Sequence, residues 1–214
     1  MLRPYRDILT KPGALAFSLT GVLARLPISM VGIGIVLMLS AMYDSYSLAG
    51  RVSAAYVIAS ALCGPQLARF VDRYGQARIM RPATAVALVG LISLIVVATL
   101  GADTAWLYVT AVVAGAPGGS FGSLVRTRWS FVLSDPRQLH TAYSLESALD
   151  EVVFVVGPVL ATVLATSVSP SAGLIVPIIA LVVGGYLFLS LRATEPQASV
   201  RAPDATAGPG GPGG

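Results

Sequence analysis

Charged residues are scarce in this chain. They make up 11% of its 214 residues, whereas soluble domains carry about 25%. Hydrophobic residues account for 55%, which leaves too little polar surface for a water-soluble fold. The composition therefore excludes soluble enzymes and predicts an integral membrane protein surrounded by the lipid bilayer.

Cysteine and histidine are nearly absent. Cys63, the single cysteine, lies inside an apolar run, which excludes a disulfide framework and a cysteine-based metal site. Ser120 lies in a Gly-x-Ser-x-Gly pattern, which can present a serine nucleophile. His140, the single histidine, is expected roughly 20 Å away along the bilayer normal, too far for a Ser-His pair. We therefore expect no enzyme activity, no metal and no cofactor.

Long apolar runs fill most of the sequence. Six of them reach about 20 residues, the length at which a helix crosses a hydrocarbon core of roughly 30 Å. Glycine and proline inside the runs favour packed, bent helices over a transmembrane barrel, which would show short alternating strands. The prediction is an all-α integral membrane protein with six transmembrane helices, at 14–41, 48–70, 83–100, 105–124, 141–166 and 172–191.

The last part of the chain has a different composition. Residues 193–214 are rich in Pro, Gly and Ala and bury too little apolar area to offset the entropy of ordering. We expect a transmembrane domain over 1–192, followed by a disordered tail or a truncated interdomain linker.

Basic residues concentrate on one side of the expected helices. All of the 14 Lys and Arg lie there except Arg25, inside the first span, and Arg51. By the positive-inside rule both termini are expected in the cytoplasm, in a multi-pass protein of the plasma membrane. The basic residues are topology signals in this interpretation, so no nucleic-acid partner is expected. Trp129 is expected among the aromatic residues of the inner membrane interface.

Helix-breaking residues recur at a nearly constant offset. Pro27 and Pro117 lie 90 residues apart, and the Gly-Pro pairs that end at Pro65 and Pro158 lie 93 apart. The offset predicts a 3+3 inverted repeat, as in secondary transporters, with breaks that free backbone groups for a cavity near the midplane. Tight helix packing alone is the alternative explanation of the glycines in 114–123. The candidate break and cavity residues are Pro27, Pro117, Gly118, Gly119, Ser120, Gly157 and Pro158.

Charged side chains also occur within the expected spans. Arg25 is about 11 residues into the first span, and Glu146, Asp150 and Glu151 are about 5 to 10 residues into the fifth. An unpaired charge at such depth would cost several kcal/mol, so these side chains must face protein or water. Arg25 and Asp150 should differ in depth by only about 3 Å and are expected to pair, whereas the shallower Glu146 could meet an arginine at the end of the fourth helix. The cluster is either a structural salt bridge or a proton-coupling site.

A short loop after the second span combines an acid, bases and a glycine. Asp72 and Arg73 are followed by Gly75 and Arg78. The loop resembles the signature loop of the major facilitator superfamily, Gly-x-x-x-Asp-Arg-x-Gly-Arg-Arg. Asp72, Arg73 and Gly75 match it, Ala68 replaces its first glycine, and Arg78 lies one step beyond its paired basic positions.

This resemblance implies the N-terminal six-helix half of a twelve-helix transporter that rocks around a central site. It implies secondary active transport of a small-molecule substrate, with ion-gradient-coupled export favoured over uptake. The loop would then latch and release a helix end during gating. A missing C-terminal half or a second copy is the expected partner. The alternatives are a channel or permease subunit and a non-transporting six-helix membrane scaffold.

Overall fold

The computed structural model describes residues 3–118 and 121–196. Within these residues the chain is helical apart from short connections, and it forms no strand. The helices are α1 (Arg3–Leu9), α2 (Ala14–Tyr43), α3 (Tyr46–Tyr74), α4 (Gln76–Thr99), α5 (Thr104–Gly115), α6 (Phe121–Val132), α7 (Pro136–Ser167), α8 (Ala172–Ala180) and α9 (Tyr186–Ser190), with a π-helical turn at Leu181–Gly185 and a 3-10 turn at Arg192–Thr194.

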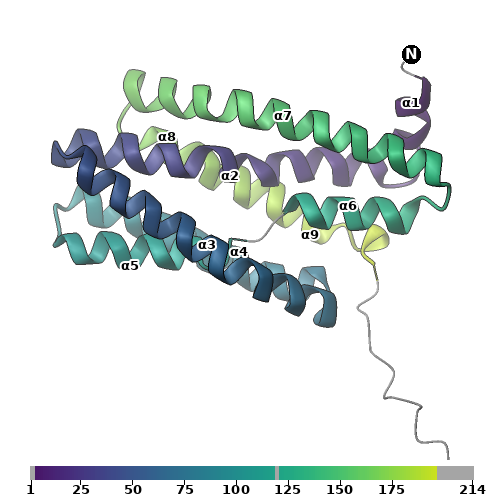
Figure 1. The fold of residues 1–214 in the computed structure, drawn as a ribbon, viewed down its shortest axis with the longest axis horizontal. Helices are drawn as coiled ribbons and strands as arrows, with labels where there is room; N and C mark the ends of the chain where they lie inside the picture. The colour runs from purple at the N-terminus through teal and green to yellow at the C-terminus, as the bar shows by residue number, and fades with distance from the viewer. Residues whose placement is uncertain (1–2, 119–120, 197–214) are drawn as a thin grey trace, which may run out of the picture.

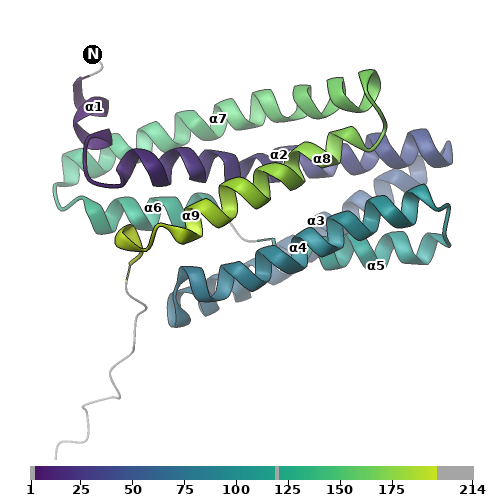
Figure 2. The same cartoon turned by 180° about the vertical axis from the view of Figure 1, so that it is seen from behind.

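The helices run back and forth along one common direction (Figure 1). α2 lies in the middle of the bundle, with α7 on one side and α3 on the other, and α4 and α5 pack against each other beside α3. The view from behind shows α8 and α9 crossing a third side of α2 (Figure 2). Because α1 and α9 lie at the same end, both described ends of the chain are on one side of the bundle.

Within the described part of the chain, five helical stretches are long and apolar enough to cross a membrane. They are α2, α3, α4, α7 and the combined run Ala172–Ser190, and they correspond to five of the six expected spans. The expected fourth span is divided into α5 and α6, which have 12 residues each. The chain leaves the helical conformation between them at 116–118.

Prolines have different effects in the first and fourth spans. Pro27 lies inside α2, which continues without interruption for 30 residues, so the break expected in the first helix is wrong. Transmembrane helices tolerate proline where neighbouring helices support the backbone, and α2 packs against α3, α7 and α8. Pro117 has glycines at 115 and 118 beside it, which weaken the helix further, and here the helix does end. Pro158 lies inside the continuous α7, as Pro27 does in α2.

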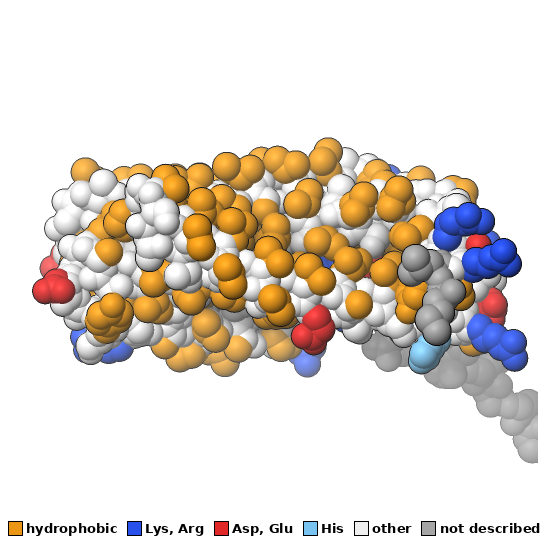
Figure 3. All heavy atoms as spheres, turned by 90° about the horizontal axis from the view of Figure 1, so that it is seen from above, with side chains coloured by type: hydrophobic (Ala, Val, Ile, Leu, Met, Phe, Trp, Pro, Cys, Tyr) orange, Lys and Arg blue, Asp and Glu red, His pale blue; other side chains and the backbone are white. Residues whose placement is uncertain are grey.

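Hydrophobic side chains cover the outside of the bundle as well as its interior. Val152, Val155 and Val159 of α7 are exposed, and Figure 3 shows hydrophobic side chains spread over most of the face, with most of the visible Lys and Arg at the end near α1. A surface of this kind is suited to lipid, with the basic end at the headgroups.

Candidate functional site

Close packing of α2 brings the intramembrane charges together. A Cβ at Gly157 of α7 would collide with Ser29 of α2, and a Cβ at Gly184 would collide with Leu23. Glycine at these two positions lets α7 and the π-helical turn approach the α2 backbone closely. Arg25 lies between these contacts and faces α7, which carries Glu146 and Asp150.

All three nitrogens of the Arg25 guanidinium are used. Nε donates to the Gly21 carbonyl at 3.1 Å, Nη1 to Asp150 Oδ1 at 2.8 Å and Nη2 to Glu146 Oε2 at 2.6 Å. The pairing expected between Arg25 and Asp150 is present. Arg25 is 4% exposed, so one cation inside the bundle serves two carboxylates on successive turns of α7.

Glu146 is the fully buried carboxylate of the cluster, at 0% exposure. Besides Arg25, Ser18 Oγ donates to its Oε1 at 2.7 Å and Trp129 Nε1 donates to the same oxygen at 2.8 Å. The expected pairing of Glu146 with an arginine of the fourth span is therefore wrong, because its cationic partner is Arg25 of α2. The expected place of Trp129 at the membrane interface is also wrong: its ring is buried against Phe17, with 4.8 Å between the ring centroids.

Asp150 has a more open environment. Its Oδ2 accepts a hydrogen bond from Arg126 Nη2 at 2.7 Å while its Oδ1 accepts from Arg25. Asp150 is 23% exposed and Arg126 is 39% exposed. Glu151, one residue further, is exposed on another face of α7, because consecutive helical positions differ by about 100°. The structure thus links Arg25, Glu146, Asp150 and Arg126 in one chain of ion pairs that does not include Glu151.

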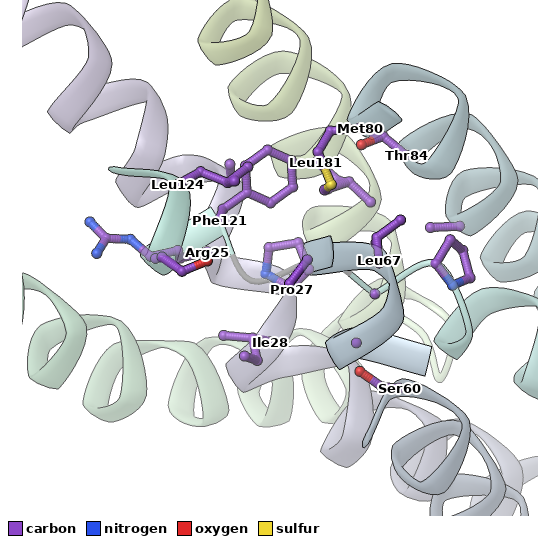
Figure 4. A pocket seen from close by; sticks show the side chains of 18 of the residues that line it. Arg25, Pro27, Ile28, Ser60, Leu67, Met80, Thr84, Phe121, Leu124 and Leu181 are labelled. Atoms are coloured by element: carbon purple, nitrogen blue, oxygen red, sulfur yellow. The ribbon is translucent and has the colours of Figure 1, made fainter. Parts of the chain in front are cut away.

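A cavity of about 400 Å³ borders this cluster. Arg25, Arg126 and Asp150 line one part of it, and residues of α2 to α7 together with Pro117, Gly118 and Leu181 line the rest. In Figure 4, Arg25 and Thr84 lie well apart, with Pro27, Phe121 and Leu181 drawn between them.

The candidate break residues are distributed unevenly around this cavity. Pro27, Pro117 and Gly118 line it, although Pro27 does so from an intact helix. Gly119 and Ser120 lie outside the described residues. Gly157 and Pro158 lie within the continuous helix α7, where Gly157 packs against α2.

The loop with the acid and the glycine forms the turn between α3 and α4. Gly75 has φ 94° and ψ 153°, a conformation that side chains disfavour, and its N–H donates to the Val71 carbonyl at 2.8 Å. Asp72, Arg73 and Arg78 are exposed around it. The Ala77 N–H, in the first turn of α4, donates to Glu195 Oε1 at 2.7 Å. The side chain of Glu195, near the C-terminal end of the described residues, therefore stabilises the turn.

A second arginine, Arg128, is also buried, and the sequence did not predict its contacts. Its Nε donates to Gln76 Oε1 at 3.0 Å, its Nη1 donates to Thr194 Oγ1 at 3.1 Å, and its guanidinium lies 3.9 Å from the centroid of the Phe188 ring. The contacts of Arg128 reach Thr194 and the hydrogen bond from Ala77 reaches Glu195, so both residues contact the helices although they lie beyond position 192. Residues 197–214 of the expected tail lie outside the described residues. Only long-range contacts give Arg128 this role, so no local sequence signal announces it.

The sequence matches the family model of the Major Facilitator Superfamily over residues 17–211. The chain belongs to the major facilitator superfamily. This confirms the resemblance seen in the loop at Asp72, Arg73 and Gly75, and it identifies the chain as a membrane transporter in general terms. Comparison with curated proteins and with solved structures gave no match. Within this major facilitator protein, the cavity beside Arg126 and Asp150 is the candidate functional site.

Proposed function

We propose that the chain is the N-terminal half of a secondary active transporter, which exports a small molecule by alternating access and draws on an ion gradient. One observation carries this proposal. Asp150 is a carboxylate within a membrane span, it joins two arginines, and it also borders a cavity. Ionisable groups at such positions characterise ion and substrate pathways.

Protonation of Asp150 would change what holds α6 to α7. A neutral Asp150 attracts Arg126 only weakly, and within 3–118 and 121–196 Arg126 has no other hydrogen-bond partner. Arg25 would keep its bond to Glu146. A proton that enters through the cavity therefore weakens the contact of α6 selectively, while α2 and α7 stay joined. Such a change at one helix can bias a rocking motion.

The finer architecture is part of the same proposal. The six membrane crossings form a 3+3 inverted repeat, with both termini in the cytoplasm of a plasma-membrane protein. Asp72, Arg73, Gly75 and Arg78 act as the gating latch, and the partner is a C-terminal six-helix half or a second copy of this chain. The gathering of basic side chains at the end near α1 supports this orientation.

The test uses the assembly that contains this chain, purified from its native membrane and placed in liposomes with a pH-sensitive dye inside. Candidate solutes are added on one side under an imposed pH gradient. We expect at least one solute to change proton flux in the wild type and none to do so in Asp150→Asn. Glu151→Gln, a neighbouring carboxylate outside the ion-pair chain, is the matched control and should behave as the wild type.

The outcomes separate the three functions. Solute flux that needs no ion gradient and saturates poorly would indicate a channel or permease subunit. Abundant, folded protein with no flux of any solute would favour the scaffold. Unchanged coupling in Asp150→Asn would remove Asp150 from the mechanism. The mass of the purified assembly tells whether a second copy or a separate half is the partner.

A further inference from the structure

The charges that face the cavity do not balance. Arg25, Arg126 and Asp150 line it, whereas Glu146 does not. Glu146 is fully buried behind Arg25, where Ser18 and Trp129 hold its carboxylate. A molecule in the cavity therefore meets two cations and one anion, although the four-residue cluster as a whole is neutral.

Among the charged side chains of the cavity, Arg126 has unused hydrogen-bonding capacity. Asp150 already accepts from one arginine on each oxygen, and Arg25 uses every guanidinium nitrogen. Arg126 makes one described hydrogen bond, through Nη2, and is 39% exposed. Because a guanidinium presents five N–H donors in one plane, Arg126 has donors left for a bound molecule. The charged part of the lining can thus give hydrogen bonds but has little capacity to accept them.

A neutral polar group lies elsewhere in the cavity lining. Thr84 of α4 is 2% exposed, and its Oγ1 has no hydrogen-bond partner in the described part of the chain. A buried hydroxyl without a partner is costly and rare. The remaining lining is mainly apolar, with Pro27, Phe121 and Leu181 among its side chains. This part of the cavity therefore suits the apolar body of a ligand, and a polar atom at the far end of that body could pair with the Thr84 hydroxyl.

We propose that this cavity binds an amphipathic organic anion, a molecule with one carboxylate or sulfonate group and an apolar body. The anionic group accepts hydrogen bonds from the free N–H groups of Arg126, and the body lies among the apolar side chains towards Thr84. Charge-assisted hydrogen bonds of an arginine to a carboxylate are among the strongest that proteins make. A volume of about 400 Å³ lies within the range of roughly 300–1,000 Å³ typical of small-molecule sites. This inference names the substrate class of the proposed transporter and rests on that function.

Three probes with one apolar body test the sign of the charge: 4-phenylbutyrate, 4-phenylbutanol and 4-phenylbutylamine. Binding of radiolabelled 4-phenylbutyrate to the purified native assembly in lipid nanodiscs is measured without any gradient, with the other two as competitors. Empty nanodiscs correct for partition into lipid. We expect the alcohol and the amine to compete at least about tenfold more weakly than unlabelled 4-phenylbutyrate, the size of effect that one charge-assisted hydrogen bond gives.

Substitutions then assign the preference to a residue. Arg126→Gln should weaken 4-phenylbutyrate binding about tenfold to the level of the alcohol, and Arg126→Lys should restore part of it. Arg51→Gln removes the same charge from an exposed position at the other end of the bundle and should bind as the wild type. Size-exclusion profiles show whether each variant is folded. If Arg126→Gln is not, the competition series on the wild type decides.

Several results would overturn the inference. One is equal or better competition by the amine. Another is wild-type affinity for 4-phenylbutyrate in folded Arg126→Gln. A third is the absence of saturable binding of both 4-phenylbutyrate and a sulfonate probe, 2-naphthalenesulfonate. Since the binding measurement involves no gradient, these results would not change the interpretation of the proton-flux experiment. Conversely, anion binding without any flux would count against transport and not against the anion site.

Discussion

Glu146 and Asp150 lie one helical turn apart on α7 and share Arg25, yet their surroundings differ. Glu146 is fully buried and accepts hydrogen bonds from Arg25, Ser18 and Trp129. Asp150 is partly exposed, borders the cavity and shares its charge with Arg126. The first carboxylate is held in place by three donors, whereas the second is partly exposed to the cavity and divides its contacts between two arginines. Ion pairing alone therefore does not distinguish a structural carboxylate from a functional one. Access to the cavity distinguishes them.

The largest effect is expected for Arg25→Leu, which removes the cation shared by both carboxylates. Glu146 would keep no cation, and breaking a buried pair costs about 3 to 5 kcal/mol. Chemical denaturation in mixed micelles should show this loss in the free energy of unfolding, together with a low yield of folded protein.

Two double variants sharpen this result. Adding Glu146→Leu to Arg25→Leu should recover much of the lost stability, because Asp150 keeps Arg126. Adding Asp150→Leu instead should recover little, because Glu146 remains buried without a cation. Equal recovery in both would show that the two ends of the cluster do not differ.

The next effect in size is that of Glu146→Gln alone. The amide oxygen can still accept from Trp129 and Ser18, but Arg25 keeps only Asp150, and we expect a loss of about 2 to 3 kcal/mol. In a Trp106→Phe background the tryptophan fluorescence comes from Trp129. Comparing it with and without Glu146→Gln reports the change at Trp129 Nε1. A variant as stable as the wild type would contradict the structural role of Glu146.

A smaller change in stability is expected for Asp150→Asn. Arg25 keeps Glu146, and the partly exposed Arg126 can be solvated, so the loss should stay near 1 kcal/mol or below. The same denaturation measurement checks it. If Asp150→Asn destabilised the fold as much as Glu146→Gln does, the two carboxylates would be equivalent and the comparison would fail.

The smallest effect belongs to Glu151→Gln, since Glu151 lies outside the ion-pair chain. The free energy of unfolding should not change measurably, and a double-mutant cycle with Arg25 should show no coupling. Clear coupling between positions 25 and 151 would mean that Arg25 also serves the exposed face of α7.

The sequence was sufficient to predict five long apolar helices and the Arg25–Asp150 contact. Apolar length locates a span, and counting residues from the membrane boundary gives the depth of a charge. Depth alone does not show which neighbouring helix a side chain faces, so it did not identify Arg25 as a partner of Glu146. Trp129 and Ser18 become partners of Glu146 only through the packing of α2, α6 and α7, and no local pattern encodes that meeting.

The effect of proline shows the same limit. Pro27 and Pro117 both lie inside apolar runs of the sequence. In the structure α2 continues through Pro27, whereas α5 ends before Pro117. The difference depends on the glycines at 115 and 118 beside Pro117 and on the neighbouring helices that support α2, and the support of α2 is a long-range effect. For the same reason the contact of Glu195 with Ala77 could not be foreseen from the composition of the chain's end.

The division of the fourth span also sets a condition on how the chain enters the membrane during synthesis. The insertion machinery accepts segments of about 20 apolar residues, whereas α5 has 12 residues and α6 carries Arg126 and Arg128. The expected fourth span would therefore be a poor insertion signal by itself. Arg126 gains its counter-charge only when Asp150 has been synthesised, 24 residues later. The fourth and fifth crossings should accordingly leave the translocon as a pair, with the ion pair formed at that moment holding them together.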